Sequence, residues 1–414
     1  MAAVLHVLPA GILVRKGRDP MPARSAVIFI PNDTSRSGAA RPMMLMRIMG
    51  TPLLSWLATS LSACGISRCF LVCHSRCLEE AKACFPESMA LSCAADQDAA
   101  DLLHVFLSTA DDKEEEVLVI TGPAVCIPSK SAIPDEERTD AATGVCTVSR
   151  AAFMSVLDEK FSFMDFLMRN GAACSEQDGF FAISSPDELP DWQPILKRMY
   201  LYELAENGVE IWDYDNCYIE PSVRVGAGSV ILPGTILRGR TVIGSGCTIG
   251  PNCLLEDAVI GDRSAVNASQ IYCSTVGADT TIGPFAYIRP DCRIGDKIRI
   301  GDFVEVKNSV IGDGTKISHL TYIGDSDVGR GVNFGCGTVT VNYDRAKKYR
   351  TVIEDHSFIG CNANLIAPVT VGQGAYVAAG STITENVPPQ ALGIARARQS
   401  NKKDWAARHK LKEK

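Results

Sequence analysis

The sequence has 414 residues, of which 46% are hydrophobic, and its formal net charge is −7. A chain of this length is expected to form two domains, and its acidic balance argues against nucleic acid as a partner. No apolar run approaches the length of a membrane span, and the opening residues MAAVLHVLPAGILV lack a basic segment before the apolar one. We therefore expect neither membrane insertion nor a secretory signal.

Residues 25–190, after an N-terminal extension at 1–24, have the pattern of an α/β domain. Ala26 to Ile30, Cys69 to Val72 and Val117 to Ile120 are short apolar runs typical of buried strands. Pro52 to Cys64 has leucines at helical spacing between the first two runs. This alternation predicts a parallel sheet with crossover helices.

A linker helix is predicted within residues 191–210. Asp191 can cap its start and Asn207-Gly208 can end it. Five residues should share its buried face: Trp192, Ile195, Leu196, Met199 and Tyr202.

Residues 211–390 contain a six-residue repeat of aliphatic side chains. A period of six fits neither an amphipathic helix nor a simple alternating strand, whereas short strands joined by tight turns account for it. Each unit is then one side of a three-sided coil, with its aliphatic side chain pointing into a shared core, and such coils bury their faces only by stacking. The repeat occupies three runs: Ile219, Val225, Ile231, Leu237, Ile243, Ile249, Leu255; Val276, Ile282, Ile288, Ile294, Ile300, Val306; and Ile353, Ile359, Leu365, Val371, Val377, Ile383.

The 16 cysteines are scattered, no CxxC pair occurs, and Cys247, Cys253 and Cys292 fill small-residue positions of the repeat. This usage predicts free thiols in a reducing cytoplasm.

Polar residues common in active sites interrupt the repeat between Gly301 and Asp344. The stretch contains the motifs GDFVEVKNSVIGDGTKISHLTYIGD and NFGCGTVTVNYD, and it is flanked by GPFAYIRP, FIGCNANLIAPVTVG and ALGIARARQ. With these motifs, residues from about 207 to 405 resemble the acetyltransferase half of the bacterial bifunctional N-acetylglucosamine-1-phosphate uridyltransferase/glucosamine-1-phosphate acetyltransferase. The resemblance implies a left-handed parallel β-helix that forms a homotrimer with active sites between subunits, and a C-terminal tail at 391–414.

The resemblance also implies the roles of individual residues in acetyl transfer from acetyl-CoA to an amino-sugar phosphate. His319 would be the general base, since histidine titrates in the range needed to deprotonate an amine, and Glu305 would orient it. The substrate would be bound by Arg289, Lys307, Tyr322, Asn333 and Lys348. Acetyl-CoA would be bound by Cys336, Asn342, Tyr343, Cys361, Ala379 and Arg396.

Plainer interpretations of these residues remain open. His319, Arg289 and Lys307 are also what a solvated coil surface carries, and an acyl-cysteine at Cys361 is an alternative to direct attack by the amine. Lys348 lies in the insertion NYDRAKKYR, where the family has Gly after NYD and this chain has Arg345.

The N-terminal half resembles the uridyltransferase half of the same enzyme but departs from its pattern. In IPNDTSRSGAARPM the loop glycines are Asn32 and Thr34, and the expected lysine is Met43. The magnesium-binding Asp and Asn correspond to Pro123 and Ser184. Because proline offers no carboxylate to a cation, this comparison predicts that uridyl transfer is lost and that Mg²⁺ is not used.

Three functions are therefore compared. The first is a cytoplasmic enzyme that makes N-acetylglucosamine-1-phosphate for UDP-N-acetylglucosamine and cell-envelope synthesis and has a degenerate nucleotidyltransferase-like domain. The second is the full bifunctional enzyme, and the third is a non-catalytic trimeric scaffold, which the intact HLTY, NYD and IARAR motifs oppose.

Overall fold

The computed structural model describes residues 24–31, 41–95, 99–111, 115–127, 143–158, 171–174 and 176–409. The chain divides into two compact units. The first ends at Tyr214 and includes Tyr218–Arg224, and the second consists of Asp215–Cys217 and Val225–Lys414.

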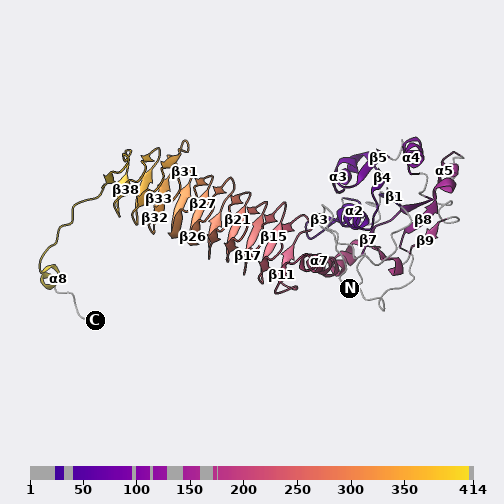
Figure 1. Cartoon of the computed structure of the whole chain (residues 1–414), viewed down its shortest axis with the longest axis horizontal. Coiled ribbons are helices and arrows are strands. Elements are labelled where there is room, and N and C mark those ends of the chain that lie inside the picture. Colours follow the sequence, from indigo (N-terminus) through magenta and orange to yellow (C-terminus); the bar gives the residue numbers. More distant parts are fainter. Residues whose placement is uncertain are drawn as a thin grey trace. The chain divides into compact units, whose positions relative to one another are not determined.

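The first unit is built on a sheet with strand order β5-β4-β1-β6-β8-β9 (Figure 1). Strands β5, β4, β1 and β6 are parallel, as the sequence predicts, while β8 and β9 are antiparallel at one edge. The sheet strands are β1 (Ser25–Phe29), β4 (Arg68–Cys73), β5 (Ala90–Ala95), β6 (Glu116–Ile120), β8 (Val145–Ser149) and β9 (Ala172–Ala173). Two small ladders join β2 (Arg47–Ile48) to β3 (Thr51–Pro52) and β7 (Ala124–Cys126) to β10 (Phe180–Ala182).

Helices cover both faces of this sheet. Leu57 of α2 (Leu53–Ala63) and Ala81 of α3 (Leu78–Lys82) pack in one core with Ile28 and Leu71. Residues of α4 (Ala99–Ser108) and α5 (Arg150–Asp158) pack in the other core with Val27 and Phe70. Successive residues of β1 and β4 thus serve opposite cores, because side chains alternate along a strand.

The linker helix is α7 (Leu189–Glu206). Its N-cap is Glu188, without a side-chain capping bond, so the expected cap at Asp191 is wrong. The expected buried face is partly wrong as well: Tyr202 is exposed, and burial extends over Leu196, Met199 and Tyr200 to Leu201, Glu203 and Leu204. The buried face is wide because α7 contacts β2 as well as β11 (Glu210–Ile211) and β12 (Tyr218–Ile219).

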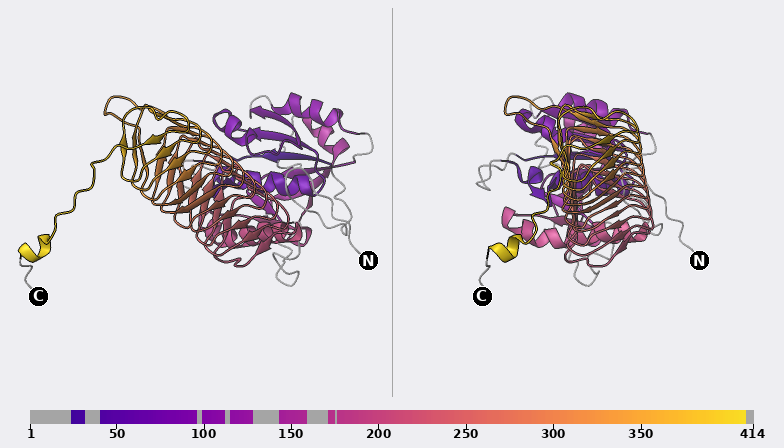
Figure 2. Two further views of the ribbon diagram at one scale, coloured as in Figure 1. Left: turned by 60° about the vertical axis from the view of Figure 1, so that its left-hand side comes forward. Right: turned by 90° about the vertical axis from the view of Figure 1, so that its left-hand side faces the viewer.

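The second unit is a parallel β-helix whose coils stack along one axis (Figures 1 and 2). After β13 (Arg224–Val225), strands recur in threes and form three long parallel sheets. The first sheet contains β14 (Val230–Ile231), β17 (Thr248–Ile249), β20 (Ala265–Val266), β23 (Thr281–Ile282), β26 (Arg299–Asp302), β29 (Lys316–His319), β32 (Asn333–Phe334), β35 (Phe358–Ile359), β38 (Tyr376–Val377) and β40 (Leu392–Gly393). The second contains β15 (Ile236–Arg238), β18 (Leu254–Glu256), β21 (Gln270–Tyr272), β24 (Tyr287–Ile288), β27 (Glu305–Lys307), β30 (Tyr322–Gly324), β33 (Val339–Val341), β36 (Asn364–Ile366) and β39 (Thr382–Ile383). The third contains β16 (Val242–Ile243), β19 (Val259–Ile260), β22 (Thr275–Val276), β25 (Arg293–Ile294), β28 (Val310–Ile311), β31 (Ser326–Val328), β34 (Thr351–Ile353) and β37 (Thr370–Val371).

The aliphatic residues of the six-residue repeat form the core of this β-helix. Every residue of the three predicted runs is buried except Val225, which is half-buried. Small hydroxyl side chains are buried at the corners and bond to backbone of the neighbouring coil; Ser229 Oγ, for example, donates to the Gly244 carbonyl at 2.8 Å and accepts from Cys247 N at 3.0 Å. These bonds satisfy backbone groups where the strands turn. A short helix, α8 (Trp405–Arg408), follows in the tail.

Among the described residues, none of the helices is long and apolar enough to cross a bilayer.

Candidate active site

His319 ends strand β29, at the corner between the first and second sheets. Its Nδ1 atom lies 2.6 Å from Oδ1 of Asp302, and the imidazole is 56% exposed. Asp302 ends β26, and the two residues are direct partners in the parallel ladder. The hydrogen bond with His319 holds the pKa of the Asp302 carboxyl below its usual value. An ionised carboxylate on Nδ1 fixes the ring so that Nε2 is the nitrogen that faces away from Asp302.

Glu305, the expected partner of His319, bonds elsewhere. Its Oε1 atom accepts a hydrogen bond from Arg289 at 2.9 Å. The structure thus corrects the expectation: Asp302 orients the imidazole, and Glu305 orients Arg289, one of the cations expected to bind phosphate.

Lys307 lies on the outer face of the second sheet, in β27. Its Nζ atom is 3.2 Å from Oδ2 of Asp325, a buried carboxylate that also accepts from Asn308 Nδ2 at 2.5 Å. Burial by itself would raise the pKa of Asp325, but the bonds from Asn308 and Lys307 outweigh it and lower that pKa. Asp325 therefore remains an anion that anchors Lys307.

The insertion after β33 brings a second amine to Lys307. A hydrogen bond and electrostatic repulsion from Lys307 lower the pKa of Lys348, and repulsion from nearby Arg289 lowers it further. The same hydrogen bond raises the pKa of Lys307. We call Arg289, Lys307 and Lys348 the anion cluster. Three cations at one place, two of them competing for protons, are suited to a phosphate group that would relieve their repulsion.

The insertion loop is held by its own bonds. Asp344 Oδ1 accepts from the backbone N–H groups of Ala346 and Lys347, both at 2.8 Å, and Tyr343 donates its hydroxyl to the Arg345 carbonyl at 2.7 Å. Arg345 has a φ of 80°, in the left-handed region that favours glycine. The loop thus keeps a glycine-type conformation although an arginine occupies the position.

Tyr322 and Asn342 join the anion cluster on the second sheet. Asn342 Nδ2 contacts Oδ2 of Asp325 and lies 3.4 Å from the Tyr322 hydroxyl. A Cβ atom on Gly324 would stand 2.3 Å from the Tyr322 hydroxyl and 2.7 Å from Asn342 Nδ2, so a larger residue at 324 would displace these side chains. The structure places the Asn342 side chain beside the anion cluster, apart from the other residues expected to bind acetyl-CoA.

Three of those other residues, Cys336, Cys361 and Ala379, stack on the corner that carries His319. Partner residues on successive coils keep the same difference in number on both sides of this corner. The difference is 17 from β29 to β32 (317 and 334) and from β30 to β33 (322 and 339). It is 25 from β32 to β35 (334 and 359) and from β33 to β36 (339 and 364), and 18 from β35 to β38 (359 and 377) and from β36 to β39 (364 and 382). His319 therefore stacks on Cys336, Cys336 on Cys361, and Cys361 on Ala379. We call Asp302, His319, Cys336, Cys361 and Ala379 the corner column.

Arg396 lies just beyond the corner column. Its Cδ atom is 3.8 Å from where a Cβ atom on Gly380 would stand. Within the corner column, the small side chains of Cys336, Cys361 and Ala379 lie between His319 and Arg396. An extended thioester cofactor with a charged nucleotide end would match that order.

Two predicted site residues are not brought to either group. Asn333 starts β32 on the first sheet, opposite Lys316 and Phe358, away from the second-sheet face that carries Tyr322. The Tyr343 side chain is 56% exposed on the insertion loop.

Sequence reasoning missed Asp302, Gly324 and Asp325. For Asp325 the signal was available in the length of a coil, because it follows Lys307 by three six-residue units; for Asp302 it was not, because the coil that ends at His319 is one position shorter. Asp302 precedes His319 by one coil, and Asp325 follows Lys307 by one coil.

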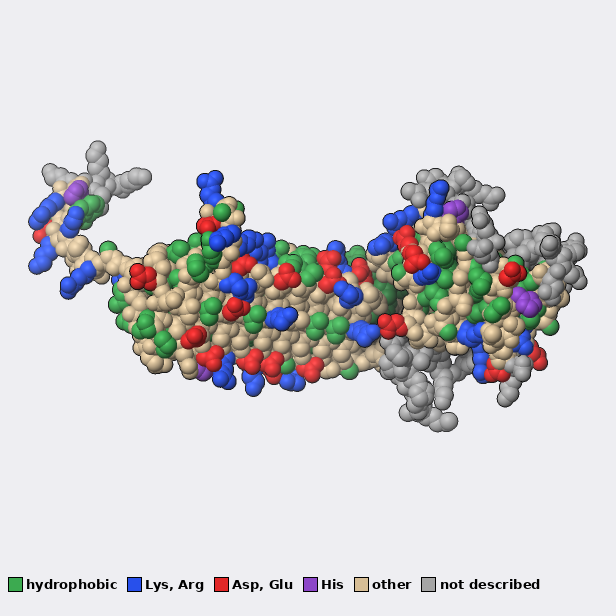
Figure 3. Space-filling model, turned by 90° about the horizontal axis from the view of Figure 1, so that it is seen from above, with side chains coloured by type: hydrophobic (Ala, Val, Ile, Leu, Met, Phe, Trp, Pro, Cys, Tyr) green, Lys and Arg blue, Asp and Glu red, His purple; other side chains and the backbone are tan. Residues whose placement is uncertain are grey.

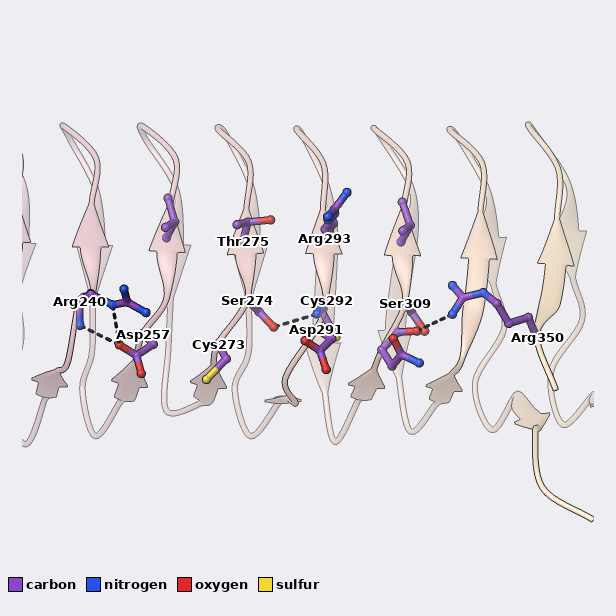
Figure 4. Close-up of a pocket in the computed structure, with 13 residues that line it drawn as sticks. Arg240, Asp257, Cys273, Ser274, Thr275, Asp291, Cys292, Arg293, Ser309 and Arg350 are labelled. Atoms are coloured by element: carbon purple, nitrogen blue, oxygen red, sulfur yellow. Dashed lines mark hydrogen bonds and ion pairs between the residues drawn. The ribbon is translucent and has the colours of Figure 1, made fainter. Parts of the chain in front are cut away.

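A separate groove of about 680 Å³ runs along the corner between the second and third sheets (Figure 4). Its walls include Arg240, Asp257, Cys273, Asp291 and Arg293, and Arg350 closes one end by pairing with Asp327. None of the predicted site residues lines this groove. We place the candidate site at the corner column and the anion cluster because of the chemistry of their side chains, not because of the volume of a cavity. On the β-helix face seen in Figure 3, acidic and basic side chains alternate without forming a large patch of one sign.

In the first unit, Asn32 and Thr34 lie outside the described residues. Met43 is buried at 5% exposure, so its side chain belongs to the domain interior. At the end of the ladder between β7 and β10 the Pro123 carbonyl accepts from Ile183 N at 2.9 Å, and Ser184 is the residue after Ile183. Proline has no side-chain oxygen, and the Pro123 carbonyl already accepts one hydrogen bond, so the Pro123 side chain supplies no ligand for a Mg²⁺ ion. Among the described residues, no group of three His, Cys, Asp or Glu side chains is arranged to hold a metal.

The fold and the repeat define a class. The family described as Bacterial transferase hexapeptide (six repeats) matches residues 273–308 and 350–385. The second unit is therefore a left-handed parallel β-helix of hexapeptide repeats, and the fold expected from the sequence is confirmed, with an α/β first unit.

More specific relatives are proteins named "Bifunctional protein GlmU". That of Bacillus velezensis is 60% identical over 200 residues, covering 48% of this chain and 44% of the relative. That of Clostridium acetobutylicum is 56% identical over 235 residues, covering 57% and 52%. The resemblance drawn from the motifs is thus confirmed, and the chain spans about half the length of the curated relatives it matches.

Solved structures are similar at a lower level. An Arabidopsis UDP-N-acetylglucosamine acyltransferase shows 18% identity and a TM-score of 0.33 over 45% of this chain and 70% of its own. The inositol-1-phosphate CTP transferase from T. maritima shows 13% identity and a TM-score of 0.32 over 44% and 98%. Likenesses of this size bear on neither activity nor substrate.

Proposed function

We propose that the second unit transfers an acetyl group from acetyl-CoA to the amine of glucosamine-1-phosphate, giving N-acetylglucosamine-1-phosphate. The observation that carries this proposal is the Asp302–His319 pair at 2.6 Å, standing where the corner column meets the second-sheet face with its anion cluster. A general base, an anion site and a path for a thioester cofactor thus occupy neighbouring positions on one β-helix.

The reaction needs an unprotonated amine, because only the lone pair of nitrogen attacks the thioester carbonyl. His319, held through Nδ1 by Asp302, would take the amine proton on Nε2 as the carbon–nitrogen bond forms. The anion cluster would bind the sugar phosphate, with Glu305 fixing the direction of Arg289 and Asp325 that of Lys307. Tyr322 and Asn342 would contact the sugar.

Acetyl-CoA would lie along the corner column with its thioester near His319 and its nucleotide toward Arg396. Cys336, Cys361 and Ala379 are small enough to leave room for the pantetheine arm. Since Asn342 is engaged by Asp325 and Tyr322, the backbone at Cys361 is the better candidate for the oxyanion contact.

The site is incomplete in one chain, which supports a homotrimer. Asn333 faces away from the anion cluster on a different sheet, and the site is an open surface, so a second copy would supply Asn333 and a wall. A cyclic arrangement repeats one interface around the axis. Light scattering should give three times the chain mass; a monomer at working concentration would contradict the assembly. A cytoplasmic location is part of the same proposal, from the free cysteines and the substrates.

The test is an assay of the purified protein with acetyl-CoA and glucosamine-1-phosphate, following release of the CoA thiol. His319→Asn should lower turnover by roughly 10²–10⁴, the usual contribution of a general base. His356→Asn is the matched control, since His356 is an exposed corner histidine outside the candidate site. Equal turnover of the two variants would reject the assignment.

A second candidate function is uridyl transfer by the first unit, which would make the protein bifunctional. The specific observation is the name of the relatives, which favours two activities and gives no support to the expected loss of one or to the expected absence of Mg²⁺. Against it stand buried Met43 and Pro123, whose side chain offers no ligand to a cation.

One measurement separates these functions. UTP, Mg²⁺ and N-acetylglucosamine-1-phosphate are added to the protein, and pyrophosphate is followed with and without a chelator. Chelator-sensitive release of pyrophosphate establishes the bifunctional enzyme. Release no faster than from a protein-free control leaves acetyl transfer alone.

A further inference from the structure

Two cysteines are stacked in the corner column on adjacent coils. Before the corner residue 334 pairs with residue 359, and after the corner residue 339 pairs with residue 364, so partners differ by 25 in residue number on both sides. Cys336 and Cys361 are therefore in register. The backbone confirms the pairing, because Gly335 N donates to the Ile359 carbonyl at 2.7 Å and Asn362 N to the Cys336 carbonyl at 2.8 Å.

The coils are close at this point. A Cβ atom on Gly335 would stand 2.5 Å from the Cys361 nitrogen, and neighbouring strands of a sheet are about 4.8 Å apart. Disulfides join residues whose Cα atoms are roughly 4.4–6.8 Å apart. The spacing therefore permits a cross-coil disulfide, at the short end of the range.

This pair differs from the buried cysteines of the β-helix. Cys247, Cys253 and Cys292 are buried, and burial raises the pKa of each thiol. Cys361 is exposed and Cys336 is half-buried, and neither thiol has a hydrogen-bond partner among the described residues. A reagent can thus reach Cys361 first, with Cys336 behind it as a second thiol.

We propose that Cys336 and Cys361 form a dithiol that reacts with the disulfide of coenzyme A and thereby switches acetyl transfer off. The proposal rests on the proposed binding of acetyl-CoA along the corner column. The oxidant is then the oxidised form of the ligand for which this surface is shaped, and the nucleotide end would approach Arg396 as it does in the substrate.

The chemistry is two thiol–disulfide exchanges. The Cys361 thiolate attacks one sulfur of the CoA disulfide, forming a Cys361–CoA mixed disulfide and releasing one CoA thiol. The Cys336 thiolate then attacks the Cys361 sulfur, forming the Cys336–Cys361 disulfide and releasing the second CoA thiol. Two protein thiols are oxidised, one CoA disulfide is reduced, and the two protons pass to the released thiols.

The consequence follows from the position of the pair. Cys336 stacks directly on His319, so either product places sulfur bonds across the path from Arg396 to the base. A disulfide that is exposed and short between its Cα atoms is of the kind that thiols reduce readily. The switch is therefore reversible.

Cys273 provides a matched control. It is also exposed, in a corner of the β-helix, but Figure 4 shows it between Asp257 and Asp291, the residues in register with it on the neighbouring coils, and Cys292 beside Asp291 is buried. Cys273→Ser should leave every result below unchanged.

The test treats the full-length protein with CoA disulfide and maps disulfides by mass spectrometry. We expect loss of 2 hydrogens between Cys336 and Cys361 as each CoA disulfide is consumed, at least about tenfold loss of acetyl transfer, and full recovery with dithiothreitol. Glutathione disulfide should react at least several-fold more slowly, and acetyl-CoA should protect. The Cys336→Ser variant should stop at the Cys361–CoA adduct, and Cys361→Ser should resist oxidation, each variant being compared with itself before treatment.

Failure to form the Cys336–Cys361 bond, or equal inactivation of a variant lacking both cysteines, overturns the proposal. The mapped bond is read without any activity. If it forms but the reduced protein transfers no acetyl group, the proposed function fails, and the switching role fails with it. If the reduced protein is active and the bond does not form, the switch alone is rejected.

Discussion

Replacing Asp302 by Asn tests which carboxylate orients His319. The Nδ1–Oδ1 distance of 2.6 Å and the direct strand pairing make Asp302 the partner, while Glu305 bonds to Arg289 at 2.9 Å. An amide in place of the carboxylate removes the charge that stabilises the imidazolium formed when His319 takes the amine proton. It also allows the ring to flip, because an amide can either donate or accept.

The expected size of the effect follows from exposure. Residues that orient a catalytic or metal-binding group typically contribute 10- to 100-fold. The carboxylate is 37% exposed and the imidazole 56%, so water can partly replace the lost oxygen. We therefore expect kcat to fall by about 10-fold, at the low end of that range, with KM for both substrates within about twofold.

The comparison variant is Glu305→Gln, which retains the size of the side chain. It should raise KM for glucosamine-1-phosphate by several-fold and change kcat little, because the side chain acts on Arg289. Steady-state assays with each substrate varied measure both quantities. The reasoning is refuted if Glu305→Gln lowers kcat tenfold while Asp302→Asn stays within threefold of the parent.

Three further predictions concern the loop, the anion cluster and the linker helix. Lys348→Met should raise KM for the sugar phosphate by roughly 10-fold and leave KM for acetyl-CoA unchanged; an equal rise in both constants would place Lys348 elsewhere. Arg345→Gly should retain activity and change the free energy of unfolding by less than about 1 kcal/mol, because the loss of backbone strain at φ 80° offsets the greater entropy of glycine in the unfolded chain. Arg345→Val should instead raise KM for the sugar phosphate, as Lys348→Met does. Burial raises the pKa of Glu203, whose Oε1 has no partner among the described residues, from 4.5 to about 8. The folded first unit therefore favours the protonated form of Glu203 and loses stability as pH rises from 4.5 to 8, by on the order of a few kcal/mol. Glu203→Gln should raise the Tm at pH 8 and not at pH 4. An effect on Tm that does not depend on pH would contradict the burial of this carboxyl.

The β-helix could be predicted from sequence because its core repeats. One aliphatic residue per side of each coil is enough to specify burial, and Ile231, Leu237 and Ile243 are each no more than 2% exposed. The exception, Val225, belongs to the stretch where the chain passes from one compact unit to the other. Val225 lies in β13, which ends the third sheet and so has a neighbouring strand, β16, on one side only.

The linker helix could be predicted only in its extent. A five-residue stripe was inferred from 3.6-residue spacing, which assumes one partner on one side. The structure packs α7 against β2 and also against β11 and β12, so Tyr200 and Glu203 are buried as well. Tertiary contacts that wrap around a helix leave no simple periodic trace in its sequence.

The orienting residue of the base was missed for a different reason, which lies in the length of a coil. A coil built from three sides of the regular repeat would stack His319 on Gly301, and that register offers no partner at all. The real coil between β26 and β29 is shorter by a single position, since Asp302 pairs with His319. Phe303 and Leu320 turn the corner with φ values of 54° and 45°, which tightens it without glycine. Motif position suggested Glu305, but a one-residue difference in register decides which carboxylate reaches Nδ1. In a stacked coil, the chemistry therefore depends on the corners, where the sequence pattern is weakest.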